Sequence, residues 1–205
     1  NMLILGHAGI TLGAAVLLSG AMTAFRSPIP RQENTAVASP DDSLSRLESW
    51  LTSLARHVDI RLLLIASLLP DIIDKPLGHI FFREALSNGR TIGHTLFFLI
   101  LITLAGLFLY RRGKKTWLLV LSFGTLTHLI LDQMWKTHET LLWPFFGFAF
   151  EKHDITTWIP DIIDNLTVKP GVYIPEIVGG LVLIWFAWEV LRRRKLLSFI
   201  KYGRI

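Results

Sequence analysis

The chain has 205 residues, of which 51% are hydrophobic and 18% are charged, and its formal net charge is +5. Soluble domains carry about 25% charged residues, so this composition favours a single transmembrane helical domain over residues 1–205. No cysteine is present, which excludes disulfides, zinc fingers with thiolate ligands and thiol catalysis. Any bound metal must therefore be held by His, Asp or Glu.

The first predicted element is an apolar helix over residues 3–25, long enough to cross a hydrocarbon core of about 30 Å. It has no basic flank before it and no clear cleavage site after it, so we expect a retained span rather than a signal peptide. Residues 26–57 follow as a polar cytoplasmic loop. Leucines recur at helical spacing from Leu44 to Leu54, which predicts an interfacial amphipathic helix or, alternatively, a solvated linker helix.

Four more spans are expected after this loop. Residues 57–73 are a weaker candidate that contains Pro70, and residues 91–110, 117–135 and 172–191 are more strongly apolar. Residues 136–171 form an outer loop that is rich in aromatic side chains near its start. The predicted fold class is therefore an all-α polytopic membrane protein with about five transmembrane helices.

Basic residues set the orientation of these spans, because Lys and Arg collect in cytoplasmic loops. The clusters at 111–115 and 192–195 both fall at inner ends, and alternation places residues 26–57 on the same side. Most of the 21 basic residues then lie inside. The basic charge balance thus reflects topology, and no nucleic-acid partner is expected. We place the protein in the inner (cytoplasmic) membrane of a prokaryote.

Eight ionisable residues within or beside the spans fall at the outer ends. These residues are His7, Asp71, Asp74, Arg90, His94, His128, Asp132 and Glu176. An ionisable group inside a membrane costs about 2.5–3.5 kcal/mol on insertion scales, so such groups usually face partners and mark function. These residues lie at the same side of the membrane, although the orientation of the spans was assigned only from Lys and Arg in the loops. Their common position is therefore independent support for a shared site.

Spacing favours a metal site over isolated polar residues. His128 and Asp132 are four residues apart and Asp71 and Asp74 are three apart, so each pair shares a helix face. Carboxylates with imidazoles and no thiol suit Zn²⁺, Mn²⁺ or a similar divalent ion. The alternative is a scaffold whose polar helix ends merely pack together. The histidines expected on the surface of the outer loops are His79, His138 and His153.

One short stretch recurs along the chain. The sequence LPDIIDK at residues 69–75 is echoed by IPDIIDN at 159–165. The flanking residues differ, so chance recurrence is the preferred interpretation. Asp161 and Asp164 remain secondary candidates for a second carboxylate site.

Five pieces of the chain carry a resemblance to a known family. They are GHAGITLG (6–13), LLPDIIDKPLG (68–78), GRTIGHTLFF (89–98), THLILDQMW (127–135) and LLWPFFG (141–147). In this order they resemble the YdjM-type family of membrane-bound metal-dependent hydrolases. The chain departs from the family pattern at Gly89 and Gly93, where the family often has His and Thr. Its paired carboxylates are spaced D-x-x-D, whereas D-x-D is common in the family.

The resemblance implies hydrolase chemistry at a metal centre, with these functional positions: His7, Asp71, Asp74, Arg90, His94, His128 and Asp132. We expect His7, Asp71, Asp74, His94, His128 and Asp132 to bind one or two ions, with Zn²⁺ favoured and Mn²⁺ or Mg²⁺ as alternatives. Asp74 is either a ligand or the base that orients a water, and Glu176 is the next candidate for base or ligand. Arg90 would hold a phosphate, because a guanidinium can bind two oxygens at once.

The expected substrate follows from depth in the membrane. A site at the outer headgroup level, beside the aromatic residues 141–150, suits a lipid or lipid-linked phosphoester that arrives by lateral diffusion. The alternatives are a metal-dependent membrane peptidase or amidase and a divalent-ion transporter or sensor. A transporter needs ligands near the midplane and access from both sides, which the crowding at one end does not favour.

Overall fold

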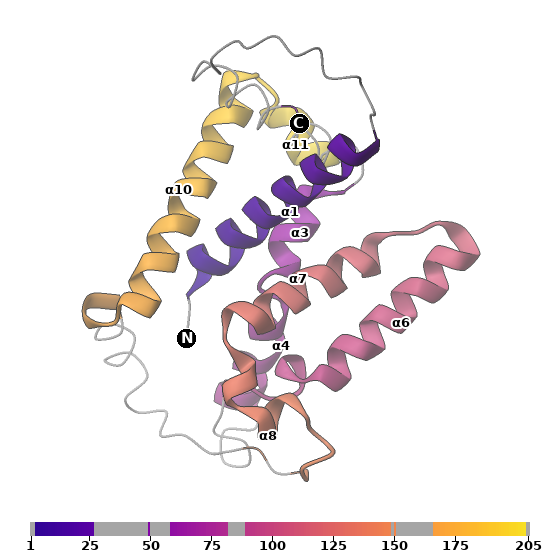
Figure 1. Cartoon of the computed structure of the whole chain (residues 1–205), viewed down its shortest axis with the longest axis vertical. Helices are drawn as coiled ribbons and strands as arrows, with labels where there is room; N and C mark the ends of the chain where they lie inside the picture. The colour runs from indigo at the N-terminus through magenta and orange to yellow at the C-terminus, as the bar shows by residue number, and fades with distance from the viewer. Residues whose placement is uncertain are drawn as a thin grey trace.

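The computed structural model describes residues 3–26, 49, 58–81, 89–148, 150 and 166–203 (Figure 1). These residues form helices and turns and contain no strand, so the predicted all-helical class is confirmed. The amphipathic helix expected within residues 26–57 falls almost entirely outside the described residues. Asp161 and Asp164, in the repeated stretch, lie outside them as well.

Among the described residues, three helices are long and apolar enough to cross a membrane: α1 (Ile4–Arg26), α6 (Leu96–Gly113) and α10 (Pro170–Arg192). The fourth apolar helix, α7 (Trp117–Leu131), has 15 residues, which at 1.5 Å per residue is about 22 Å long. The expected span 57–73 is instead divided into two short helices, α3 (Ile60–Ala66) and α4 (Leu69–Pro76). Five spans are therefore not confirmed.

The break between α3 and α4 has a local cause. Pro70 lies in the first turn of α4, where its missing N–H leaves a backbone carbonyl of the preceding turn without a helical donor. Ser67, at the end of α3, turns its hydroxyl back to the carbonyl of Leu64 at 2.7 Å. The main-chain carbonyl of Ser67 also lies at this break and is within hydrogen-bond distance of a side chain from α7.

Helices α1 and α10 pack against each other through glycine. A Cβ atom added to Gly9 would lie 2.0 Å from the carbonyl oxygen of Gly179, and one added to Gly179 would lie 2.2 Å from the carbonyl oxygen of Leu5. Gly13 faces Val182 one turn further along both helices, so the two helices run parallel. Only glycine permits this approach, which brings the start of α1 onto the second turn of α10.

The interior is apolar at one end and polar at the other. The main apolar cluster combines side chains of α1, α3, α7 and α10: Leu12, Ala15, Val16, Ile60, Leu63, Val120, Phe186 and Val190. Toward the starts of α1 and α6 the buried side chains are instead polar, among them His7, Thr11, His94, Thr125 and His128. This polar end is where the candidate site lies.

Helix ends agree with the orientation expected from charge. Helices α1, α6 and α10 all begin near the polar end, whereas Arg111 and Arg192 lie in the last turns of α6 and α10. The short elements η1 (Leu77–Phe81), η2 (Ile92–His94), η3 (Met134–Lys136) and α8 (His138–Leu141) complete the polar end. At the opposite end, α11 (Leu196–Tyr202) meets the start of α3 through a hydrogen bond from Ile60 N to the Gly203 carbonyl, 3.0 Å.

Candidate metal centre

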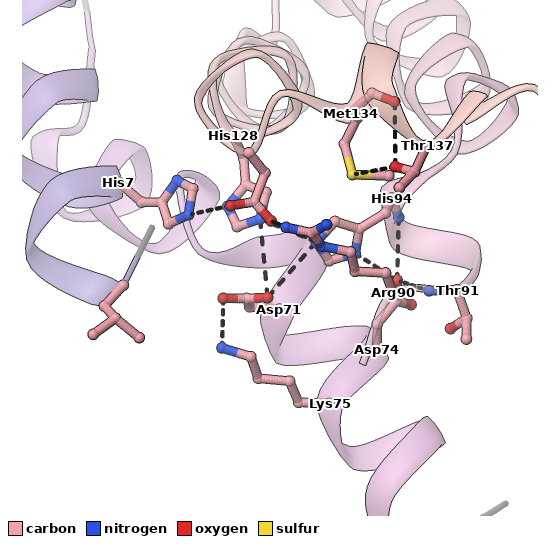
Figure 2. A network of polar contacts seen from close by, with 12 residues as sticks. His7, Asp71, Asp74, Lys75, Arg90, Thr91, His94, His128, Met134 and Thr137 are labelled. Atoms are coloured by element: carbon pink, nitrogen blue, oxygen red, sulfur yellow. Dashed lines mark hydrogen bonds and ion pairs between the residues drawn. The ribbon is translucent and has the colours of Figure 1, made fainter. Parts of the chain in front are cut away.

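Five of the six expected metal ligands meet at the polar end (Figure 2). One group contains His7, His128 and Asp132, and the other contains Asp71, His94 and His128. Within each group the potential ligand atoms lie within 4.8 Å of one another. They come from α1, α4, η2 and α7, with Asp132 directly after the last residue of α7.

Asp74 occupies a different position from the one expected. It is fully buried behind His94, and its carboxylate accepts hydrogen bonds from the backbone N–H groups of Thr91 (2.6 Å), Gly93 (2.8 Å) and His94 (3.1 Å). It also accepts from Nδ1 of His94 at 2.7 Å. Asp74 belongs to neither ligand group, and its hydrogen bonds hold the imidazole of His94 in place.

Gly93 lies in close contact with α4 in this arrangement. A Cβ atom at residue 93 would lie 3.0 Å from Cα of Pro70 and 3.2 Å from a carboxylate oxygen of Asp74. A larger side chain would push η2 away from α4. The glycine that departs from the family pattern in the sequence thus permits the close contact of these two elements here.

The imidazole of His128 is fixed in a similar way. Its Nδ1 lies 2.7 Å from the carbonyl oxygen of Ser67 at the break between α3 and α4. A carbonyl only accepts, so Nδ1 carries the proton and a neutral His128 presents an unprotonated Nε2. His94 has the same tautomer because Asp74 accepts from its Nδ1. The two Nε2 atoms face each other at 3.2 Å.

His7 completes a row of imidazoles. Its ring stacks on that of His128, with centroids 4.0 Å apart and planes 14° apart. The ring is fully buried, and among the described residues neither nitrogen meets the geometry of a hydrogen bond. Nε2 nevertheless lies 3.3 Å from Oδ1 of Asp132. Leaving a buried polar group without a partner costs about 1–3 kcal/mol, which a bound cation would relieve.

Each of the two ligand carboxylates also contacts a cation. Asp71 presents Oδ1 to His94 Nε2 at 3.7 Å, and its Oδ2 accepts from Lys75 at 2.7 Å. Asp132 pairs with Arg90 at 2.5 Å through an oxygen that lies 3.9 Å from His94 Nε2. Arg90 was predicted at the site from the sequence, whereas Lys75 was not. The available signal was its spacing, four residues after Asp71 on the same helix face.

Glu176 is the residue whose structural position differs most from expectation. Its carboxylate accepts from the backbone N–H groups of Leu3 (2.6 Å), Leu5 (3.1 Å) and Gly6 (3.1 Å). These are donors that a helix leaves unpaired at its start, so Glu176 caps α1 from a neighbouring helix. It belongs to neither ligand group and acts on the site by holding the turn that carries His7.

The donor set fits a divalent metal. Three imidazoles and two carboxylates without a thiolate are ligands of Zn²⁺ and similar ions. Ligand atoms about 2.0–2.2 Å from one ion lie roughly 3–3.5 Å from each other. Several of these atoms are 3.2 to 3.9 Å apart, and all those in each group lie within 4.8 Å. Lys75 and Arg90 offset part of the negative charge of the carboxylates, and a bound cation would add to this.

Comparisons with known proteins give one match. No curated protein and no solved structure matches the chain significantly. A protein family does match, and it covers residues 2–196, which include every residue of the site. The chain belongs to the family of the YdjM inner membrane protein.

Proposed function

We propose that this inner membrane protein is a metal-dependent hydrolase. The observation that carries the proposal is the pair of Nε2 atoms of His94 and His128, 3.2 Å apart. Both Nδ1 atoms are committed as donors, to Asp74 and to the Ser67 carbonyl. With both imidazoles neutral, two lone pairs face each other at this separation, and a proton or a metal ion between them would relieve the repulsion. Buried imidazoles whose other ring nitrogen donates to a carboxylate or a backbone carbonyl are typical of metal ligands.

The residues divide into three roles. The metal would be held by His128 together with side chains drawn from His7, Asp71, His94 and Asp132, with one coordination position left for water or substrate. A divalent metal bound there would polarise a substrate oxygen and supply an activated water at neutral pH.

Asp74 and Glu176 would position the ligands, Asp74 through His94 and Glu176 through the first turn of α1. Arg90 orients Asp132 and carries a planar guanidinium with five N–H donors, suited to the oxygens of a phosphoryl group.

We infer a single ion rather than two. His128 is the residue shared by both ligand groups, and with Nδ1 bonded to Ser67 it has one lone pair to give. A second ion would be left with two protein ligands, either Asp71 and His94 or His7 and Asp132. The majority of nitrogen donors favours Zn²⁺ over Mg²⁺, which prefers oxygen.

The aromatic residues after the site support a lipid phosphoester as substrate. The Phe97 ring, in the first turn of the apolar helix α6, lies 6.0 Å from the ring of Trp143. This contact holds the segment at the level where α6 begins. Phe145 and Phe148 project from it with 87% and 80% exposure. Aromatic side chains at the end of a span settle at the membrane interface, where a lipid headgroup would meet the metal site.

Metal content and hydrolysis, measured together, test the proposal. The wild-type protein in detergent should hold one Zn²⁺ per chain and release phosphate from phosphatidic acid in mixed micelles, and a chelator should abolish release. His94→Gln should lose both properties. His138→Gln, which changes an exposed histidine at the same end, is the matched control and should keep both. A protein that binds no divalent metal under any loading condition refutes the proposal. Cleavage of a peptide but not of the lipid would replace the substrate class.

A further inference from the structure

Lys75 is a charged residue at the metal centre to which the proposed function assigns no role. It lies in the last turn of α4, and its ammonium group contacts Oδ2 of Asp71 at 2.7 Å. An ammonium group carries three N–H donors, and Asp71 takes one of them. Figure 2 shows Lys75 on the side of Asp71 opposite the imidazoles, so Asp71 separates the ammonium from the metal ligands.

Exposure distinguishes Lys75 and Arg90 from the rest of the site. The side chains of His7, His94, His128 and Asp74 are at most 1% exposed, and that of Asp132 is 5% exposed. Lys75 is 38% exposed and Arg90 is 21% exposed. The cations therefore form the accessible rim of a buried group of ligands. A molecule that approaches the metal ligands from outside meets these two side chains.

Each of the two cations is bonded to a carboxylate that approaches the same imidazole nitrogen. Lys75 bonds to Asp71, whose other oxygen is 3.7 Å from His94 Nε2. Arg90 bonds to the oxygen of Asp132 that lies 3.9 Å from the same atom. Each cation is thus one carboxylate away from His94 Nε2. A group bound to a metal at His94 Nε2 would therefore lie near both ion pairs.

The charge balance of the site favours an anion. Asp71, Asp74 and Asp132 contribute three negative charges, and Lys75 and Arg90 contribute two positive charges. The neutral imidazoles add none, so the group carries one net negative charge. A divalent cation changes this to one net positive charge, located among donors with limited solvent access. Electrostatic attraction is strong where water is partly excluded, so the loaded site attracts a negatively charged group.

We propose that Lys75 and Arg90 form a two-sided binding site for a phosphate group at the metal centre. This inference rests on the proposed metal site and specifies what the site recognises. Lys75 would donate to one non-bridging oxygen while remaining bonded to Asp71, and Arg90 would donate to another from the opposite side. Lys is a point-charge binder and Arg a planar donor. The pair therefore suits a tetrahedral dianion better than a neutral peptide carbonyl.

Phosphate binding to the metal-loaded protein tests the inference without any need for turnover. Protein in detergent is loaded with Zn²⁺, freed of excess metal and titrated calorimetrically with inorganic phosphate, with dihexanoyl phosphatidic acid and with acetate. We expect both phosphates to bind and acetate to bind at least about tenfold more weakly. Binding of inorganic phosphate would identify the anion alone as the recognised group. Tighter binding of the lipid would identify a headgroup as its source.

Variants of Lys75 separate anion binding from support of the metal site. Lys75→Gln should weaken phosphate binding by about tenfold or more while one Zn²⁺ per chain is retained, and Lys75→Arg should restore most of the affinity. Lys136→Gln, an exposed lysine four residues after Asp132, is the matched control and should bind as the wild type does.

Three results would overturn the inference. Undiminished phosphate binding by Lys75→Gln would exclude a contact with the anion. Loss of Zn²⁺ from Lys75→Gln would show that Lys75 serves the metal ligands instead. A wild-type protein that holds Zn²⁺ and binds no phosphate would refute the anion site while leaving the metal centre intact. The metal measurement thereby distinguishes failure of this inference from failure of the proposed function.

Discussion

Replacing Asp74 with Asn tests the role that the structure gives this buried carboxylate. Asp74 accepts four hydrogen bonds, of 2.6, 2.7, 2.8 and 3.1 Å, from Thr91, Gly93 and His94. An asparagine side chain has one carbonyl oxygen, so its NH₂ group must face at least one of these donors. That donor stays buried without an acceptor, and the remaining bonds lose the charge that strengthens them.

The magnitude follows from this count. An unpaired buried donor costs about 1–3 kcal/mol, and hydrogen bonds to a charged group exceed neutral ones by about 1 kcal/mol each. With partial relaxation, we expect the free energy of unfolding to fall by about 4 kcal/mol. For a chain of this size that lowers the melting temperature by about 10 °C. Because His94 also loses its orienting partner, the affinity for Zn²⁺ should fall about 10–100-fold.

Asp71→Asn is the matched control because the same substitution is made one turn earlier in α4. Asp71 faces the imidazoles, and its other partner is the half-exposed Lys75, so the lost ion pair is worth about 0–1 kcal/mol. This variant should lose Zn²⁺ yet melt within about 3 °C of the metal-free wild type.

Intrinsic tryptophan fluorescence during heating of metal-free protein in detergent measures the two stabilities, and mass spectrometry measures bound metal. The reasoning is refuted if metal-free Asp74→Asn melts like the wild type. It is equally refuted if Asp71→Asn is destabilised as much as Asp74→Asn.

Three further substitutions test other parts of the structure. Glu176→Gln should lower the free energy of unfolding by about 1–3 kcal/mol, measured by melting, and should weaken Zn²⁺ binding through His7, measured by metal titration. Unchanged metal binding with lost activity would instead indicate that Glu176 is a catalytic base. Gly179→Ala should prevent folding, because its Cβ would overlap the Leu5 carbonyl at 2.2 Å. Gly13→Ala, the control with no contact under 3.8 Å, should elute from a sizing column and melt like the wild type. Equal behaviour of the two variants would contradict the close packing of α1 and α10. Phe148→Ser should slow hydrolysis of phosphatidic acid in vesicles and leave a short-chain soluble analogue unaffected, and equal slowing of both would argue against a membrane contact at this residue.

The pattern of residues was sufficient to predict the helical class, the approximate helices and the end of the molecule where the site lies. Hydropathy and charge can be read from each segment separately. A span requires about 20 apolar residues, and Lys and Arg collect on the cytoplasmic side. The pairing of His128 with Asp132 could also be predicted, because residues four apart share a helix face. Pro70 was visible in the sequence, but hydropathy alone did not predict that the second span is divided into two short helices there.

Only the tertiary structure decided what each carboxylate faces. Asp71 and Asp74 look equivalent in the sequence, but Asp74 meets backbone donors 17 to 20 residues away and Asp71 meets the imidazoles. Glu176 resembled a catalytic group and instead caps a helix that begins more than 170 residues earlier. A carboxylate oxygen can bind a metal, an ammonium group or a backbone N–H. The partner of each carboxylate is therefore set by the elements that the fold brings beside it, and local sequence spacing does not predict that partner.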